Sequence, residues 1–185
     1  TRKALPDLSR FKVIVLPNVN AMDEEEAAAM REYVRNGGKI YASGTTSLVT
    51  NAGELKDDFM LADVLGVSLR KADWSERGHY ISPTVDGKSL FKEWTNEYPA
   101  YTRGFGLEVS AHPETKVLAT TTGVWPREDP RQFSSIHSDP PWEATSEPEV
   151  TEHAFGRGKA IYCASLVENV PGLESSFIRL LRHLH

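Results

Sequence analysis

The feature that most constrains the fold is a strand, a helix and a second strand that follow one another near the N-terminus. Phe11–Leu16 is an apolar run rich in β-branched side chains, which is typical of a buried parallel strand. Asp23 begins a capping-box pattern, and apolar residues then recur at helical spacing until the pair Gly37 and Gly38. Lys39–Ser43 reads as the second strand. Such a unit requires two parallel strands joined by a right-handed crossover, and it therefore predicts an α/β fold.

Farther along the chain, other segments have patterns that predict secondary structure. Lys116–Thr122 is typical of a strand, and the runs Glu149–Ala154 and Lys159–Ser165 flank Phe-Gly-Arg-Gly and predict a β-hairpin. Apolar residues at helical spacing predict a terminal helix over Leu173–Leu184. Residues 70–105 show no clear period, and we expect short strands and loops there.

Between the predicted strand and the hairpin lies a long irregular stretch, residues 123–148, with five prolines and two tryptophans. Structureless loops longer than about 15 residues are uncommon in compact domains and are usually functional or disordered. Exposed tryptophan rings suit a sugar or protein surface, whereas the alternative is that both rings only hold the loop to its own domain. The residues that we predict for a ligand or partner surface are Trp125, Arg131, His137, Asp139 and Trp142.

Composition excludes several classes of function. The formal net charge of −5 leaves no basic excess to neutralise phosphates, so we expect neither a nucleic-acid partner nor an anionic membrane surface.

His137 and Asp139 lack a third ligand at a recognisable spacing, so we predict no metal and no cofactor. The one cysteine, Cys163, lies within a predicted strand and reads as a buried apolar side chain. No apolar run approaches the length of a membrane span, and a cytoplasmic location is favoured.

The loop after the second predicted strand lies where α/β folds place ligands and nucleophiles. A nucleophile elbow needs a serine or cysteine between spaced glycines, and the loop Ser43-Gly-Thr-Thr-Ser-Leu48 has neither the second glycine nor a cysteine. Its hydroxyl groups are explained more simply as caps of a turn or of a helix start. We therefore predict no catalytic residue in the chain and a degenerate elbow that consists of Ser43, Gly44, Thr45 and Ser47.

Several stretches, taken in order along the chain, resemble a known family. They are Val15–Asn18, the helix and Gly-Gly-Lys that follow it, Gly44–Leu48, Asp57–Val67, Phe133–His137 and Phe155–Tyr162. Together they resemble the class I glutamine amidotransferase-like fold, and more specifically its degenerate version, the beta-galactosidase trimerisation domain of certain glycoside hydrolases. The resemblance implies that residues 1–185 form a single flavodoxin-like, three-layer domain with a mostly parallel sheet and a C-terminal β-hairpin. In active amidotransferases a cysteine follows the strand equivalent to Ile40–Ser43, and Gly44 or its neighbours stand there in this chain.

The same resemblance implies a non-catalytic accessory and oligomerisation domain of a glycoside hydrolase. We expect a homo-oligomer, with a trimer favoured, that borders a separate catalytic barrel of the same parent chain. The barrel and the usual first strand and helix of the fold are missing, so we expect a fragment of a longer chain. Two alternatives stay open: a stand-alone small hydrolase, esterase or glycosidase, that uses Ser43, Ser47 or His137, and a module that binds carbohydrate through Trp125 and Trp142.

Overall fold

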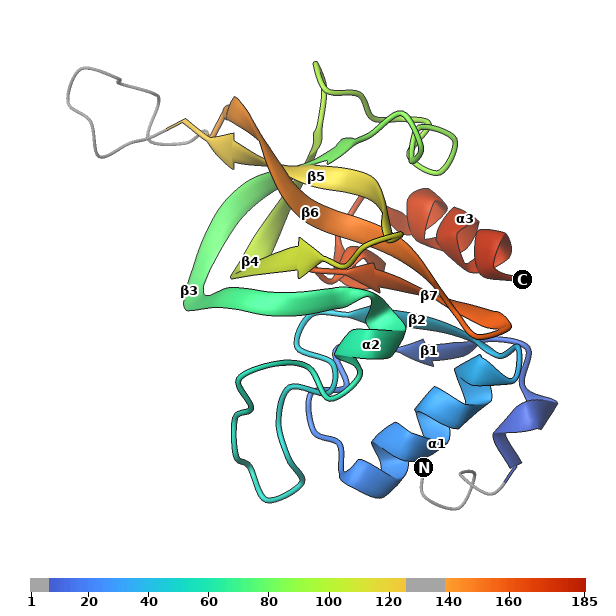
Figure 1. Cartoon of the computed structure of the whole chain (residues 1–185). Coiled ribbons are helices and arrows are strands. Elements are labelled where there is room, and N and C mark those ends of the chain that lie inside the picture. Colours follow the sequence, from blue (N-terminus) through green and yellow to red (C-terminus); the bar gives the residue numbers. More distant parts are fainter. Residues whose placement is uncertain (1–6, 126–138) are drawn as a thin grey trace.

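The computed structural model describes residues 7–125 and 139–185, which form one mixed sheet of seven strands with helices packed against it (Figure 1). Figure 1 shows that β3 to β6 curve away from the helical part of the molecule. In chain order the elements are β1 (Ile14–Leu16), α1 (Glu24–Arg35), β2 (Lys39–Ser43), α2 (Ala62–Leu65), β3 (Val67–Pro83), β4 (Ala100–Ala111), β5 (Lys116–Val124), β6 (Pro141–Phe155), β7 (Gly158–Cys163), the 3-10 helix η2 (Val167–Asn169) and α3 (Glu174–Leu184).

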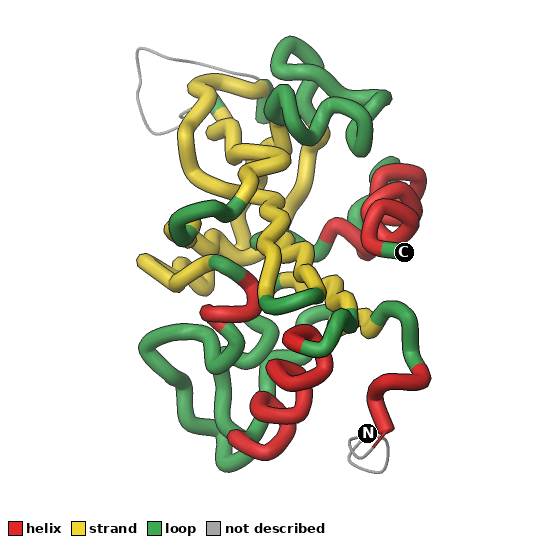
Figure 2. Tube along the Cα trace, turned by 45° about the vertical axis from the view of Figure 1, so that its right-hand side comes forward, coloured by secondary structure: helices red, strands yellow, loops and turns green. Residues whose placement is uncertain are grey.

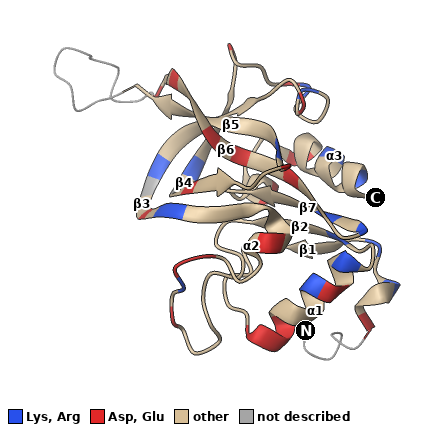
Figure 3. Ribbon diagram, in the orientation of Figure 1, with Lys and Arg blue, Asp and Glu red and all other residues tan. Residues whose placement is uncertain are grey.

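The predicted strand–helix–strand unit is confirmed. The carboxylate of Asp23 accepts a hydrogen bond from the Glu26 N–H at 2.8 Å, and the Glu26 carboxylate accepts one from the Asp23 N–H at 3.0 Å. Figure 3 shows acidic residues at the start of α1 and basic residues toward its end, which is the arrangement that the helix dipole favours. Strands β1 and β2 are parallel, with Ile14 opposite Ile40.

The prediction of a mostly parallel sheet is wrong. The strand order is β1-β2-β7-β6-β5-β3-β4, and only the pairs β1–β2 and β2–β7 are parallel, while the other four pairs are antiparallel. A parallel pair needs a crossover of a dozen or more residues, usually through a helix. Between β3 and β7 the described residues contain no helix, so each strand returns beside another in the opposite direction. The fold is therefore α/β with a mixed, curled sheet.

Residues 70–105, predicted as short strands and loops, do contain a loop over 84–99, but they also contribute most of β3 and half of β4, which are long strands. β3 extends over 17 residues and β4 over 12, and the two pair in antiparallel fashion along most of their length. Their register shifts between Leu69 and Lys71 and again between Asp73 and Glu76. Each irregularity changes the in–out alternation and bends the strand. No pattern of period two therefore survives in the sequence of this region.

Both ends of the stretch predicted to be irregular, residues 123–148, are strand in the structure, because β5 continues to Val124 and β6 begins at Pro141. Pro141 and Pro148 lie in the part of β6 whose pairing with β5 has repeated register shifts. Strands accept proline at such irregular positions, where a missing N–H removes no regular ladder bond. The predicted hairpin is confirmed as β6 and β7, which turn at Gly156 with a φ of 60°.

Alternate residues of the central parallel strands face opposite layers of helices. Ile40 and Ala42 of β2 pack on the side of α1 and α2, whereas Tyr41 packs on the side of α3. Figures 1 and 2 show α1 and α3 on opposite sides of these strands. The predicted terminal helix is confirmed as α3, whose Leu180 and Leu184 are fully buried. This packing holds the C-terminal ends of β1, β2 and β7 at one edge of the sheet, next to the curl.

Candidate functional site

A cleft lies where the C-terminal ends of β1, β2 and β7 meet the curled strands β3 and β4. Two adjoining cavities of about 360 and 300 Å³ form this cleft, and both are lined by Leu107, Ala164 and Ser165. The loops after β1 and β2 contribute Asn18 and Gly44 to one wall. Ligands of open α/β sheets bind at this edge of the parallel strands, so a functional site is expected here.

The apex of the elbow after β2 is Gly44, which has a left-handed φ of 57°. Residues other than glycine adopt this conformation only at a cost in strain. A Cβ atom on Gly44 would lie 2.5 Å from Oδ1 of Asn18 and 2.8 Å from Cδ2 of Leu166. Nonbonded atoms do not approach so closely without movement of the neighbours. The elbow therefore keeps its sharp backbone turn, while the space that a nucleophilic side chain would need is filled.

The hydroxyl groups of the predicted degenerate elbow hold two neighbouring loops together. Ser43 Oγ donates to Oε1 of Glu168 at 2.6 Å and accepts from the Asn18 N–H at 3.0 Å. Thr45 Oγ1 donates to Oδ1 of Asn18 at 2.9 Å, and Ser47 Oγ accepts from a backbone N–H at 3.2 Å. Within the described chain neither serine has a histidine partner. The geometry is that of a braced turn.

A buried polar cluster that sequence reasoning missed lines the other wall: His79 of β3, Glu149 of β6 and Ser165 after β7. Ser165 Oγ lies 2.9 Å from His79 Nε2, and Glu149 Oε2 lies 3.5 Å from the same nitrogen. Glu149 is only 3% exposed and accepts hydrogen bonds from the Ser165 N–H at 2.9 Å and from Thr121 Oγ1 at 3.0 Å. The sign of this cluster in the sequence was Glu149, an acidic residue directly before the apolar centre of a predicted hairpin strand. The sequence did not indicate which side chains Glu149 would contact.

These residue types are those of a catalytic triad, but their geometry differs. In a triad the serine and the carboxylate engage opposite nitrogens of the imidazole, so that the histidine can relay a proton. In this cluster both groups approach Nε2 of His79. The arrangement therefore ties β3 to β6 and to the loop after β7, and it does not form a proton relay.

His79 and Glu149 each stabilise the charged form of the other. Burial alone would lower the pKa of His79, but the charge of Glu149 and its hydrogen bond raise this pKa above its ordinary value. Burial likewise opposes ionisation of Glu149, yet the charge of His79 and hydrogen bonds from His79, Ser165 and Thr121 hold the pKa of Glu149 below its ordinary value. The two side chains thus form an internal ion pair over the pH range between their two pKa values.

The residues predicted for a ligand or partner surface are only partly brought together. Trp125 and Trp142 pack edge to face with ring centroids 4.0 Å apart, and Trp142 remains 42% exposed. Asp139 lies near the same end of the sheet, where Tyr101 Oη donates to its carboxylate at 3.4 Å. The other two predicted residues, Arg131 and His137, lie outside the described residues.

Larger cavities lie beside the edge strand β1, away from the cleft. One of about 570 Å³ runs along β1 and is lined mostly by apolar side chains, among them Phe11, Val15 and Val19, which are 40%, 38% and 36% exposed. Another of about 630 Å³ lies between the N-terminal segment and the end of α1. In the described sheet β1 is an edge strand, and an edge with exposed apolar side chains is suited to packing against another segment or chain.

Three further features bear on the chemistry open to the chain. Residues 7–125 and 139–185 contain no group of three or more His, Cys, Asp or Glu side chains that could hold a metal ion. Among the described helices, none combines the length and apolar character that crossing a lipid bilayer demands. Cys163 is fully buried, and burial raises the pKa of its thiol well above the ordinary value, as expected of a structural cysteine.

Comparison with known proteins gives both a family and a set of similar folds. The sequence profile of the family described as beta-galactosidase trimerisation domain matches residues 2–124. No curated protein sequence matches the chain significantly. Similar solved structures include alpha-L-fucosidase isoenzyme 2 from Paenibacillus thiaminolyticus (22% identity, TM-score 0.72), a beta-galactosidase from a Rahnella species (17%, 0.69) and a cytoplasmic protein from Salmonella typhimurium (14%, 0.65).

The share of each relative that the match covers differs widely. The alignments include 96% of this chain and 26% of the fucosidase, 96% of this chain and 23% of the Rahnella enzyme, and 97% of this chain and 74% of the Salmonella protein. The chain thus spans about a quarter of the length of the two enzymes. At these identities the similarity shows the fold alone.

Proposed function

The chain belongs to the family of beta-galactosidase trimerisation domains, and on that premise we propose that it is a non-catalytic accessory domain that joins the subunits of a larger glycoside hydrolase. The observation that carries this proposal is the family match over residues 2–124. The size of the matching enzymes supports it, because this chain covers only 23% of the Rahnella enzyme. Residues 1–185 would then be one domain of a longer chain that also contains the catalytic barrel.

The geometry of the elbow supports the absence of catalysis in this domain. The apex residue Gly44 has no room for a nucleophilic side chain, and the surrounding hydroxyl groups brace the turn. The sharp turn after β2 and the helices on both faces of β2 and β7 support the further proposal that this part descends from the flavodoxin-like, amidotransferase-like fold.

Trimer formation needs two different contact patches on each subunit, because the contacts of a closed ring of three are heterologous. Two separate apolar areas are present on the described surface. One is the groove along β1 with Phe11, Val15 and Val19, and the other includes Tyr101 and Trp142 at the far end of the curled strands. We propose that the groove along β1 receives a neighbouring subunit.

Sedimentation velocity of the intact protein tests this proposal. Val15→Glu places a charge in the groove, whereas Val85→Glu is the matched control, because Val85 is 88% exposed in the loop after β3. Burying an unpaired charge is costly. We therefore expect the wild type and the control to form trimers, and the Kd for dissociation of the Val15→Glu trimer to rise by at least about tenfold. A monomeric wild type would refute the oligomerisation function, and a trimeric Val15→Glu would refute the proposed interface.

Catalysis by this domain is tested separately with Ser43→Ala and Ser165→Ala in the intact protein. Because neither serine belongs to a proton relay, we expect the kcat/KM on aryl galactosides and aryl esters to change by less than about threefold. A loss of about 1,000-fold in a variant that still assembles would show that one of these serines is catalytic.

A further inference from the structure

We propose that the cleft between the parallel strands and the curled strands β3 and β4 binds a small neutral polyhydroxy compound, a monosaccharide or cyclitol. Its two cavities, about 360 and 300 Å³, lie at the lower end of the range for small-molecule sites. The cleft shares no lining residue with the groove along β1, and Trp142 does not line it. The proposal therefore adds a ligand site to a domain whose proposed function is assembly.

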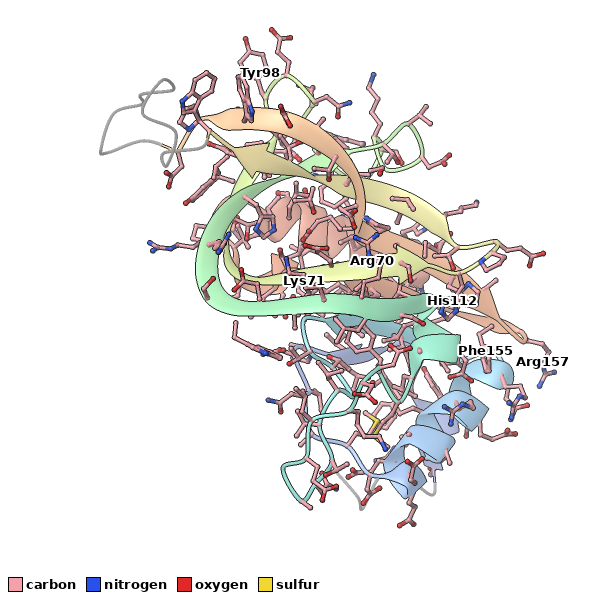
Figure 4. The ribbon with its side chains drawn as sticks, turned by 60° about the vertical axis from the view of Figure 1, so that its left-hand side comes forward. Arg70, Lys71, Tyr98, His112, Phe155 and Arg157 are labelled. Carbon is pink, nitrogen blue, oxygen red and sulfur yellow. The ribbon has the colours of Figure 1, made fainter. Side chains whose placement is uncertain are left out.

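The charged side chains that line the smaller cavity already have counter-charges nearby. A charged ligand that enters the cavity would lose its hydration shell, and the opposite charges that it meets there are already neutralised by ion pairs. Hydroxyl groups, which both donate and accept, can use the hydrogen-bonding capacity that paired carboxylates and guanidinium groups retain. Figure 4 shows Arg70 and Lys71 on the curved strand β3, whose residues Arg77, Gly78 and His79 line the smaller cavity. The ion pairs are Glu149–His79 at 3.5 Å, Glu147–Arg70 at 2.9 Å, Glu108–Arg70 at 3.1 Å and Arg77–Asp73 at 3.1 Å.

Hydrogen-bonding capacity remains on this wall after the internal contacts are counted. Among the described residues, the polar groups that contact the His79 ring, Ser165 Oγ and Glu149 Oε2, both lie at Nε2, so Nδ1 keeps its capacity for a hydrogen bond. Glu147 Oε2 is buried and lies 2.9 Å from Arg70 Nη2 as an ion pair, yet it accepts no hydrogen bond from the described residues, so this carboxylate can accept one from a hydroxyl donor. Leu107 and Ala164, which line both cavities, provide a small apolar surface for the C–H face of a ring compound.

Two glycines in the middle of β4, Gly104 and Gly106, line the cleft, and the packing around them does not require glycine. Neither Gly104 nor Gly106 has a positive φ. A Cβ atom on Gly104 would meet nothing within 4 Å, and one on Gly106 would meet only atoms of Asp73, at 3.4 and 3.9 Å. Glycine weakens a strand and often marks a close approach of a ligand or another backbone. Because no other backbone lies closer than 3.9 Å to either position, these glycines point to room kept for a ligand.

Hydrogen–deuterium exchange of the intact protein tests the site, since it reports protection segment by segment even if a catalytic domain also binds the probe. The neutral probes are D-glucose and myo-inositol, and the charged probes are inorganic phosphate and methylammonium. We expect a neutral probe to slow exchange in β3 and β4 by about twofold when its concentration equals its Kd. Gly104→Val should abolish this protection by filling the cleft. Gly123→Val is the matched control in β5, because its Cβ would meet only Glu143 O, at 3.7 Å.

Three results would overturn the proposal: no protection of β3 and β4 by either neutral probe, equal protection in Gly104→Val, or equal protection by phosphate or methylammonium. Circular dichroism and the thermal midpoint establish that the variants are folded. Should Gly104→Val fail to fold, Gly106→Ala takes its place, because a single methyl group fits beside Asp73 and still narrows the cavity.

Discussion

Glu149→Gln removes the negative charge that faces His79 while it preserves the shape of the side chain. The wild-type carboxylate accepts hydrogen bonds from the Ser165 N–H and Thr121 Oγ1 and lies 3.5 Å from His79 Nε2. Breaking a buried ion pair by removing one partner costs about 3–5 kcal/mol. The variant can relieve part of this cost because His79 can lose its proton. We therefore expect the free energy of unfolding to fall by about 3 kcal/mol near pH 6, or the Tm by about 6–12 °C for a domain of this size.

The dependence on pH identifies the ion pair as the cause. The pKa of Glu149 is lowered on folding, so its contribution is present above the ordinary carboxyl pKa of about 4.3 and is lost as the pH falls through the folded-state value. The pKa of His79 is raised on folding, so its contribution is present below the ordinary value of about 6.5 and is lost as the pH rises through the folded-state value. The difference between wild type and variant should be largest between about pH 4.5 and 6.5.

Urea unfolding followed by tryptophan fluorescence from pH 4 to 9 measures this difference. Glu143→Gln is the matched control, because Glu143 is an exposed carboxylate on the same strand, and we expect its effect to stay within about 0.5 kcal/mol. A loss below about 1 kcal/mol for Glu149→Gln at pH 6, or a loss that is the same at pH 5.5 and pH 9, would refute an ion pair that stabilises the fold.

Two further substitutions test local parts of the structure. Gly44→Ala should lower the free energy of unfolding in urea by about 2–4 kcal/mol, because the new Cβ would overlap Asn18 and the positive φ would be strained. Gly53→Ala is the control: Gly53 has a φ of 86° and a Cβ there would meet nothing within 4 Å, so only the strain of about 1–2 kcal/mol is expected. Equal losses at the two glycines would contradict the filled elbow. Asp23→Ala should lower the free energy of unfolding by about 1 kcal/mol through loss of the N-cap of α1, and Glu25→Ala, one residue into the helix, should cost less than half as much. The cap interpretation fails if the thermal midpoints of these two variants are the same.

The sequence by itself determined the parts of the fold that depend on neighbouring residues. The capping box at Asp23, the helical spacing that follows it and the glycine pair after α1 define the strand–helix–strand unit within about 30 residues. The hairpin of β6 and β7 and the terminal helix α3 were predicted for the same reason, because a turn glycine or an apolar stripe is a local signal. The resemblance to the trimerisation domain family was correct because it rests on the order of several such segments.

Only the tertiary structure decided how the remaining strands pair and where a site is formed. The antiparallel pairing of β3 to β6 depends on contacts between distant residues, and the register shifts in β3 and β6 removed the alternation that would have revealed those strands. The cluster joins His79 to Glu149 and Ser165, which follow it by 70 and 86 positions, and only the curl of the sheet brings the three around one cleft. The missing cysteine could be read from the sequence, but the filling of its place by Asn18 and Leu166 could not, because the packing of side chains from two other loops is a property of the folded chain alone.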